Sequence, residues 1–182
     1  MRTFITFEFD KRTKEEIAKV QTLIKENSFK GRFKHINNFH LTIKFLGETD
    51  NETIYEIYEE LIKNFKDINK INAYLKGIDA FRSGNNIKTI FLNVWGEIEK
   101  IKEIAVRVDD ITNKFGFKRD NKFIPHVTIA QDVELKIPFA ELKGKLEDIC
   151  IDKIIFDKIV IMKSEEIDRK RVYTPLKTLY LR

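Results

Sequence analysis

The stretch Phe39-His40-Leu41-Thr42-Ile43-Lys44-Phe45 decides the fold, because a shortened form of it returns as Pro125-His126-Val127-Thr128-Ile129-Ala130. Both copies have the order histidine, apolar residue, threonine, apolar residue. Alternate side chains of a β-strand point to the same face, so each histidine shares a face with its threonine. If the two strands face each other, two imidazoles and two hydroxyls meet in one place. That arrangement suits proton transfer around a phosphate.

The chain around the two copies alternates between strand and helix patterns. Residues 3–9 predict a strand that is buried on both faces and central in its sheet. Ser/Thr-x-x-Glu capping boxes at Thr13 and Thr49 predict helices that run to about Asn27 and Phe65. The remaining patterns predict strands over 32–36, 71–81, 88–95, 153–163 and 172–181, a hairpin loop over 83–86, a charged loop over 164–171, a helix over 98–115 closed by Gly116, and a short helix with Pro138 in its first turn.

Each motif strand is followed by a helix and then by further strand, which indicates two related halves. No proline-rich or glycine-rich linker separates them. We therefore predict a single bilobed domain over residues 1–182, of the α+β class. Two antiparallel sheets in a pseudo-twofold arrangement would surround a central groove, with helices on their outer faces.

The composition favours an anionic partner in a reducing compartment. The 182 residues include 34 Lys and Arg against 29 Asp and Glu, a formal net charge of +5, without the dense basic stripe of a strong non-specific nucleic-acid binder. The alternative is that these lysines reflect a compositional bias spread over a solvated surface. Cys150 is the single cysteine, which excludes an intramolecular disulfide. The start of the chain is a strand pattern, and no apolar run is long enough for a membrane span, so we expect a cytoplasmic monomer that binds no membrane.

A histidine pair can supply both proton transfers of phosphodiester cleavage. An unperturbed histidine titrates near pH 6.5, so one ring can accept a proton while the other donates one. Thr42 and Thr128 would donate hydrogen bonds to non-bridging phosphate oxygens as charge develops there. By simple alternation Lys44 lies on the face of His40, and we expect it to add positive charge at the phosphate. This chemistry needs neither a metal nor a cofactor.

The alternatives for these residues are weaker. A zinc site built on His40 and His126 has only His35 as a third imidazole and no cysteine cluster to complete it, so we expect no metal. His35 has no counterpart in the second half, which favours a surface or packing role. Trp95 and most phenylalanines are expected in the core. Three phenylalanines near the motifs are candidates for a nucleobase contact, namely Phe33, Phe39 and Phe123.

These motifs resemble those of the two-histidine (2H) phosphoesterases, and within them the RNA 2′,3′-cyclic phosphodiesterases long labelled 2′-5′ RNA ligases. The resemblance covers nearly the whole chain. The residues that carry it are Arg2-Thr3-Phe4-Ile5, Asn38-Phe39-His40-Leu41-Thr42-Ile43-Lys44-Phe45-Leu46-Gly47-Glu48, Phe81, and Phe123-Ile124-Pro125-His126-Val127-Thr128-Ile129-Ala130. The resemblance implies the bilobed fold, an RNA or small-nucleotide substrate, and opening of a 2′,3′-cyclic phosphate to a 2′-phosphate. It also implies that His40 is the proton donor, protonated before reaction, and that His126 is the acceptor.

One position departs from the family pattern. The family commonly has Leu-Ala-Arg after the second motif, whereas this chain has Ile129-Ala130-Gln131. Gln131 is thus a candidate substrate-binding residue that lacks the charge, and simple alternation places it opposite His126 unless the strand bulges. Residues that would compensate are Lys44, Arg119 and Lys122. Two other functions remain open: a 2′-5′ phosphodiesterase or weak 2′-5′ RNA ligase, and a nucleotide-binding or RNA-binding module with low turnover.

Overall fold

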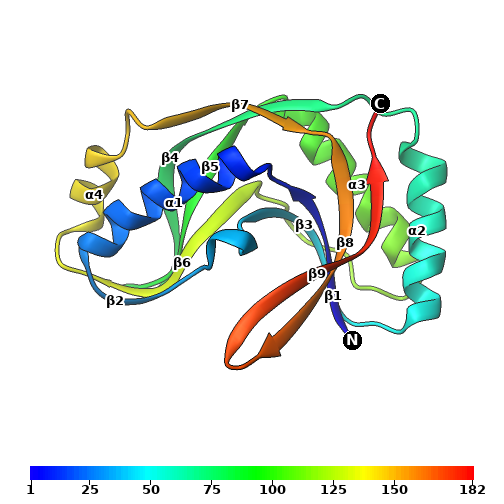
Figure 1. Ribbon diagram of the computed structural model, residues 1–182, viewed down its shortest axis with the longest axis horizontal. Coiled ribbons are helices and arrows are strands. Elements are labelled where there is room, and N and C mark those ends of the chain that lie inside the picture. The colour runs from blue at the N-terminus through cyan, green and yellow to red at the C-terminus, as the bar shows by residue number, and fades with distance from the viewer.

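The computed structural model describes all residues, Met1–Arg182, and consists of two antiparallel sheets with helices on their outer faces (Figure 1). The four-stranded sheet has the order β3-β1-β8-β9 and the five-stranded sheet the order β2-β6-β5-β4-β7. The strands are β1 (Arg2–Glu8), β2 (Ser28–Phe33), β3 (His40–Glu48), β4 (Ile71–Ser83), β5 (Asn86–Gly96), β6 (His126–Leu135), β7 (Cys150–Phe156), β8 (Lys158–Ile167) and β9 (Lys170–Tyr180). The helices are α1 (Lys11–Glu26), α2 (Asn51–Phe65), α3 (Ile98–Asn113) and α4 (Phe139–Lys145), with a 3₁₀ turn over Ile36–Asn38. The predicted fold class is confirmed.

Strand β1 lies between β3 and β8, and its residues Thr3–Phe7 are buried. The prediction of a central strand buried on both faces is therefore confirmed. One hydrophobic cluster takes residues from both sheets and from all four helices. Burial of this shared apolar surface is the main stabilising contribution to the fold. None of the helices combines the length and the apolar character needed to cross a membrane.

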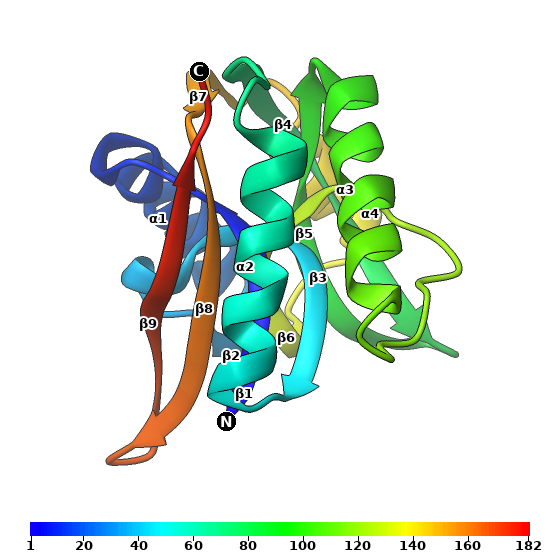
Figure 2. The same ribbon diagram turned by 90° about the vertical axis from the view of Figure 1, so that its right-hand side faces the viewer.

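Two helices are exchanged between the sheets. Helix α1 follows β1 of the four-stranded sheet but packs against β2, β6 and β7 of the other sheet, and α3 follows β5 but packs mainly against β3, with a smaller contact to β4 of its own sheet. Figure 2 shows α3 beside α2, and these two helices contact each other. Helices α1 and α4 thus cover the five-stranded sheet, while α2 and α3 cover the four-stranded sheet (Figure 1).

The helix starts differ from the predicted capping boxes. The N-caps are Asp10 and Asp50, whose carboxylates accept hydrogen bonds from the Thr13 and Thr53 backbone N–H groups at 2.7 and 2.8 Å. A short carboxylate is at least as good a cap as threonine and also interacts favourably with the positive end of the helix dipole. Thr49 instead accepts a hydrogen bond from the Thr3 hydroxyl at 3.0 Å. The predictions of Thr13 and Thr49 as caps were therefore wrong.

The C-terminal strands also differ from the prediction. The run predicted as one strand over 153–163 is divided at Asp157 into β7 and β8, which belong to different sheets. Most of the predicted loop over 164–171 is strand, because β8 and β9 continue to a tight turn at Asp168 and Arg169, with φ of 50° and 60°. This hairpin extends beyond the sheets (Figure 1). The strand predicted over 32–36 ends at Phe33, before the 3₁₀ turn.

Candidate active site

The two motif strands meet where the sheets adjoin. Strand β3 is the edge of the four-stranded sheet, β6 is the second strand of the five-stranded sheet, and their Cα atoms approach within 8 Å. His40 and His126 are the first residues of these strands. The two rings are close enough that the charge of one contributes to lowering the pKa of the other. The structure thus brings the two predicted histidines close together, at the junction of the two sheets, which is called the groove below.

Both imidazoles are oriented in the same way. The Nδ1 atom of His40 lies 2.7 Å from the Asn38 carbonyl oxygen, and Nδ1 of His126 lies 2.6 Å from the Ile124 carbonyl oxygen. Because a carbonyl can only accept, Nδ1 carries the proton in each ring and Nε2 has a free lone pair when the ring is neutral. In the first copy the Thr42 hydroxyl lies 2.9 Å from Nε2 of His40 and donates to it.

Burial keeps both rings neutral at pH 7. His40 is 8% exposed, and its burial, followed by the nearby positive charge of Lys34, lowers its pKa to about 3. Burial also lowers the pKa of His126, against the opposing hydrogen bond to Ile124, and Lys34 lowers it further. The expected protonation of His40 before reaction therefore does not hold for the protein by itself. A phosphate beside Nε2 would raise the pKa of His40 again, because an anion favours the imidazolium.

Aromatic side chains hold each imidazole. The rings of Phe4 and Tyr173 have their centroids 4.9 and 5.2 Å from that of His40. Phe81 and Phe91 each lie 5.1 Å from the His126 ring, and Phe81 is 37% exposed. Next to His40 is a cavity of about 270 Å³. Its walls include the side chains of Phe4, Lys14, Val160, Met162, Tyr173 and Pro175.

A β-bulge follows the threonine in each motif strand. Between β3 and β1, Thr42 is opposite Thr6 and Lys44 is opposite the next β1 residue, Ile5, so Ile43 is an extra residue. Between β6 and β5, Thr128 is opposite Phe91 and Ala130 is opposite Ile90, so Ile129 is the extra residue. An extra residue reverses the alternation beyond it. The two motif strands are therefore more alike in structure than in sequence, because each has a bulge directly after its threonine.

The bulges decide where Lys44 and Gln131 point. Beyond the bulge of β3, Phe45 takes the face of His40 and Thr42, while Lys44 turns to the core side opposite Ile5. Beyond the bulge of β6, Gln131 shares the face of His126 and Thr128. The expectation from simple alternation was wrong for Lys44, whereas for Gln131 the alternative of a bulge is confirmed, and its half-buried amide lies on the face of His126.

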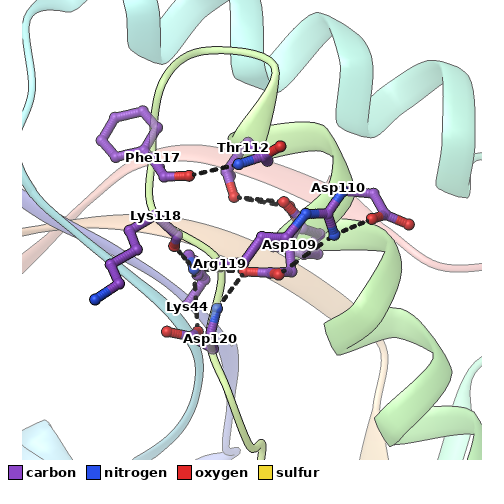
Figure 3. Close-up of polar contacts among 10 residues, drawn as sticks. Lys44, Asp109, Asp110, Thr112, Phe117, Lys118, Arg119 and Asp120 are labelled. Atoms are coloured by element: carbon purple, nitrogen blue, oxygen red, sulfur yellow. Dashed lines mark hydrogen bonds and ion pairs between the residues drawn. The ribbon is translucent and has the colours of Figure 1, made fainter.

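The side chain of Lys44 forms ion pairs with two carboxylates (Figure 3). Its side chain is 2% exposed, and Nζ lies 2.5 Å from Asp109 Oδ1, 3.2 Å from Asp120 Oδ2 and 2.6 Å from the Lys118 carbonyl oxygen. Two acidic neighbours neutralise its charge, so the predicted contribution of Lys44 to phosphate binding was wrong. Lys44 instead ties β3 to α3 and to the loop that leads into β6.

The other predicted residues divide into buried, paired and exposed groups. Phe39 is 0% exposed and packs in the core, so its predicted nucleobase contact was wrong. Phe123 is partly buried against the same core. Arg119 pairs with Asp110 and lies 3.7 Å from Asp109, whereas Lys122 is exposed.

His35, the third histidine of the chain, does not belong to the histidine pair. His35 is exposed and accepts a hydrogen bond from its neighbour Asn37, which agrees with a surface role. No group of three or more His, Cys, Asp and Glu side chains is arranged to hold a metal ion.

Sequence reasoning missed Lys34. This side chain follows β2, and its positive charge lowers the pKa of both His40 and His126. Burial lowers the pKa of Lys34 itself to about 8. It has no carboxylate partner, and its Nζ lies 5.7 Å from the centre of the Tyr173 ring. Nothing in the spacing of the sequence distinguishes it from neighbouring lysines, because only the pairing of β2 with β6 brings it to the groove.

Comparison with known proteins agrees with this geometry. A model of the 2′-5′ RNA ligase superfamily matches residues 9–166. An RNA 2′,3′-cyclic phosphodiesterase of Methanocaldococcus jannaschii is 33% identical over 148 residues, which are 81% of this chain and 78% of that protein. One of Aquifex aeolicus is 27% identical over 191 residues, 100% of this chain and 97% of that protein.

Solved structures share the fold. The structure of Escherichia coli LigT complexed with 3′-AMP has a TM-score of 0.79 at 19% identity, and the match covers 99% of this chain and 97% of that one. A Thermus thermophilus protein has a TM-score of 0.80 at 19% identity and covers 100% of this chain and 98% of its own. Together with the family match over most of its length, these findings show that the chain belongs to the 2′-5′ RNA ligase superfamily of 2H phosphoesterases.

Proposed function

We propose that this protein is an RNA 2′,3′-cyclic phosphodiesterase that opens the cyclic phosphate to a 2′-phosphate by two-histidine acid–base catalysis. The observation that carries the proposal is the matched pair of imidazoles, each with Nδ1 held by a backbone carbonyl, so that Nε2 is the nitrogen available to exchange a proton once Thr42 releases that of His40. Relatives that match most of this chain bear the same name.

The reaction assigns one proton transfer to each ring. Nε2 of His126 accepts a proton from the attacking water as the water oxygen bonds to phosphorus. The bond from phosphorus to the ribose O3′ breaks, and the imidazolium of His40 donates its Nε2 proton to that oxygen. His40 takes up this proton when the anionic substrate binds, because the phosphate offsets the effect of burial on its pKa.

The threonines stabilise the charge that develops on the phosphate. When Nε2 of His40 is protonated it no longer accepts from the Thr42 hydroxyl, which is then free to donate its own proton to a non-bridging oxygen. Thr128 shares the face of His126 and donates in the same way. Because His40 protonates the ribose oxygen, the nucleoside lies on its side of the groove. The adjoining cavity, whose walls combine the aromatic rings of Phe4 and Tyr173 with polar and charged side chains, accommodates that part of the substrate.

The test is turnover of a panel of 2′,3′-cyclic mono- and oligonucleotides. His40→Ala and His126→Ala should each lower kcat/KM by about 10² to 10⁴, the usual contribution of a positioned acid or base. His35→Ala, which removes the exposed third histidine, is the matched control and should leave the rate unchanged. Full activity in either groove variant would refute the mechanism, and loss of activity in EDTA would point to a metal site instead.

A second candidate is cleavage or weak joining of 2′-5′ phosphodiester linkages, which the same rings serve in either direction. The match to the 2′-5′ RNA ligase superfamily favours this second activity. Product analysis on 2′-5′ linked dinucleotides separates the two activities. The third candidate, a binding module with low turnover, rests on the neutral Gln131 amide at the groove. Tight binding of adenosine 2′-monophosphate without turnover of any cyclic phosphate would favour it.

A further inference from the structure

Lys34 is a partly buried cation of the groove that has no counter-ion. The other lysine that affects His40, Lys14, is paired with Glu8, and Lys44 is paired with Asp109. No carboxylate lies within 4.0 Å of Lys34, although burial makes its charged form costly. A partly buried ammonium without a carboxylate partner is suited to bind an anion from solution.

Strand pairing places Lys34 on the catalytic face. Arg32 is opposite Gln131 and Phe33 is opposite Ala130, and the Lys34 N–H donates to the Ile129 carbonyl at 3.1 Å. Directly opposed residues point to the same side of a sheet, and alternate residues share a side. Lys34 thus lies on the side of Gln131, which is also the side of His126 and Thr128.

The other end of the side chain approaches the first lobe. Nζ lies 5.7 Å from the ring centre of Tyr173, and that ring packs edge-on against His40. The positive charge of Lys34 also lowers the pKa of both histidines, which agrees with an ammonium near both rings. Lys34 is thus tied by its backbone to the strand of His126 and approaches, through its side chain, the aromatic ring that packs on His40.

We propose that Lys34 binds a non-bridging oxygen of the substrate phosphate and supplies the positive charge that the neutral Gln131, on the same face, does not supply. This inference rests on the proposed function, because the phosphate it describes is that of the cyclic substrate. It extends that function by assigning a substrate-binding residue outside both motifs.

A second consequence follows for the catalytic rings. The charge on Lys34 opposes protonation of His40 and His126, and a bound phosphate cancels that opposition. Lys34 therefore couples substrate binding to the uptake of the proton that His40 later donates. The remaining titratable groups around the rings are Glu8, Lys14 and Tyr173.

The experiment compares Lys34→Met and Lys34→Arg with Lys30→Met, a charge-matched control. Lys30 lies on the same strand β2, exposed and paired with Glu134 at 2.8 Å. Binding of inorganic phosphate and of adenosine 2′-monophosphate is measured by calorimetry. Lys34→Met should weaken both by about 10- to 100-fold, the factor for one charged hydrogen bond, whereas Lys34→Arg should stay within a few-fold of the wild type. Lys30→Met should bind like the wild type.

Two further readouts separate phosphate binding from a structural role. In Lys34→Met the pKa values of both imidazoles, followed by NMR, should rise because a nearby cation is lost. The double variant Lys34→Met with Gln131→Arg should recover part of the lost affinity, since it restores a cation on the same face. A folded Lys34→Met protein with unchanged phosphate affinity and unchanged imidazole titration would overturn the inference.

Failure of this inference is distinct from failure of the proposed function. Wild-type turnover of cyclic phosphates with an unaffected Lys34→Met variant refutes the role of Lys34 alone. Absence of turnover in the wild type refutes the proposed function, and the binding series then still decides whether Lys34 holds a phosphate. Should Lys34→Met fail to fold, Lys34→Gln in the same assays replaces it.

Discussion

Replacing Lys34 by methionine should make the protein more stable at neutral pH, although it should weaken phosphate binding. Burial lowers the pKa of this lysine from 10.5 to about 8. Each unit of such a shift corresponds to about 1.4 kcal/mol between the two protonation states. The charged side chain therefore lowers the free energy of unfolding by about 3 kcal/mol at pH 7, and methionine, of similar length and without charge, removes that penalty.

The pH dependence gives this prediction its sign. Between pH 8 and 10.5 the unfolded chain holds the Lys34 proton more firmly than the folded protein does, so wild-type stability contributed by this group rises with pH. The advantage of Lys34→Met should accordingly be complete below about pH 8 and largely lost near pH 10.5. Other groups titrate over this range in both proteins, and their effects cancel in the difference.

The assay is urea unfolding of wild type, Lys34→Met and the control Lys30→Met at pH 7 and pH 10. In a parallel thermal unfolding measurement, about 3 kcal/mol corresponds for a chain of this size to a Tm difference of roughly 6–12 °C. Added phosphate should narrow the gap at pH 7, since it stabilises the wild type preferentially. A gap that is absent at pH 7, or that does not shrink as the pH rises, would show that Lys34 is not a penalised cation.

Two further predictions concern residues away from the two histidine rings. Lys44→Met should lower the free energy of unfolding by about 3 kcal/mol, because it leaves the carboxylate of Asp109, 13% exposed, without its lysine, and the KM of the folded protein should stay unchanged. A raised KM with unaltered stability in urea would show instead that Lys44 binds the phosphate. Thr13→Val should raise the free energy of unfolding by about 1 kcal/mol, since the buried Thr13 hydroxyl has no hydrogen-bond partner; a loss of stability in thermal unfolding would show that the hydroxyl is satisfied.

The sequence predicted the parts of the fold and site that depend on local periodicity. Alternation placed His40 beside Thr42 and His126 beside Thr128, and the spacing of apolar residues predicted α2 and α3 closely. These features depend on residues a few positions apart, so a single strand or helix contains the information. The repeat of the motif then sufficed to predict two lobes that meet at a groove.

What failed depends on pairing between distant strands. The bulges at Ile43 and Ile129 are fixed by the registers of β3 with β1 and of β6 with β5, which no local pattern encodes. They turned Lys44 inward and Gln131 outward, the reverse of simple alternation. The division of the chain at Asp157 is equally non-local, because Lys153–Lys163 reads as a continuous strand until its two halves join different sheets. Lys34 was missed for the same reason.

The exchange of α1 and α3 has a consequence for how the protein would behave when its chain is divided into fragments. Each sheet is covered in part by a helix that follows a strand of the other sheet, so neither sheet would keep its complete cover if taken alone. The lobes are therefore interlocked and do not behave as two rigid bodies on a hinge. A fragment ending between α2 and β4 would expose the apolar face of α1, and its refolding would require complementation by the remainder of the chain. The junction of the two motif strands thereby depends on both exchanged helices, because β3 packs against α3 and β6 packs against α1.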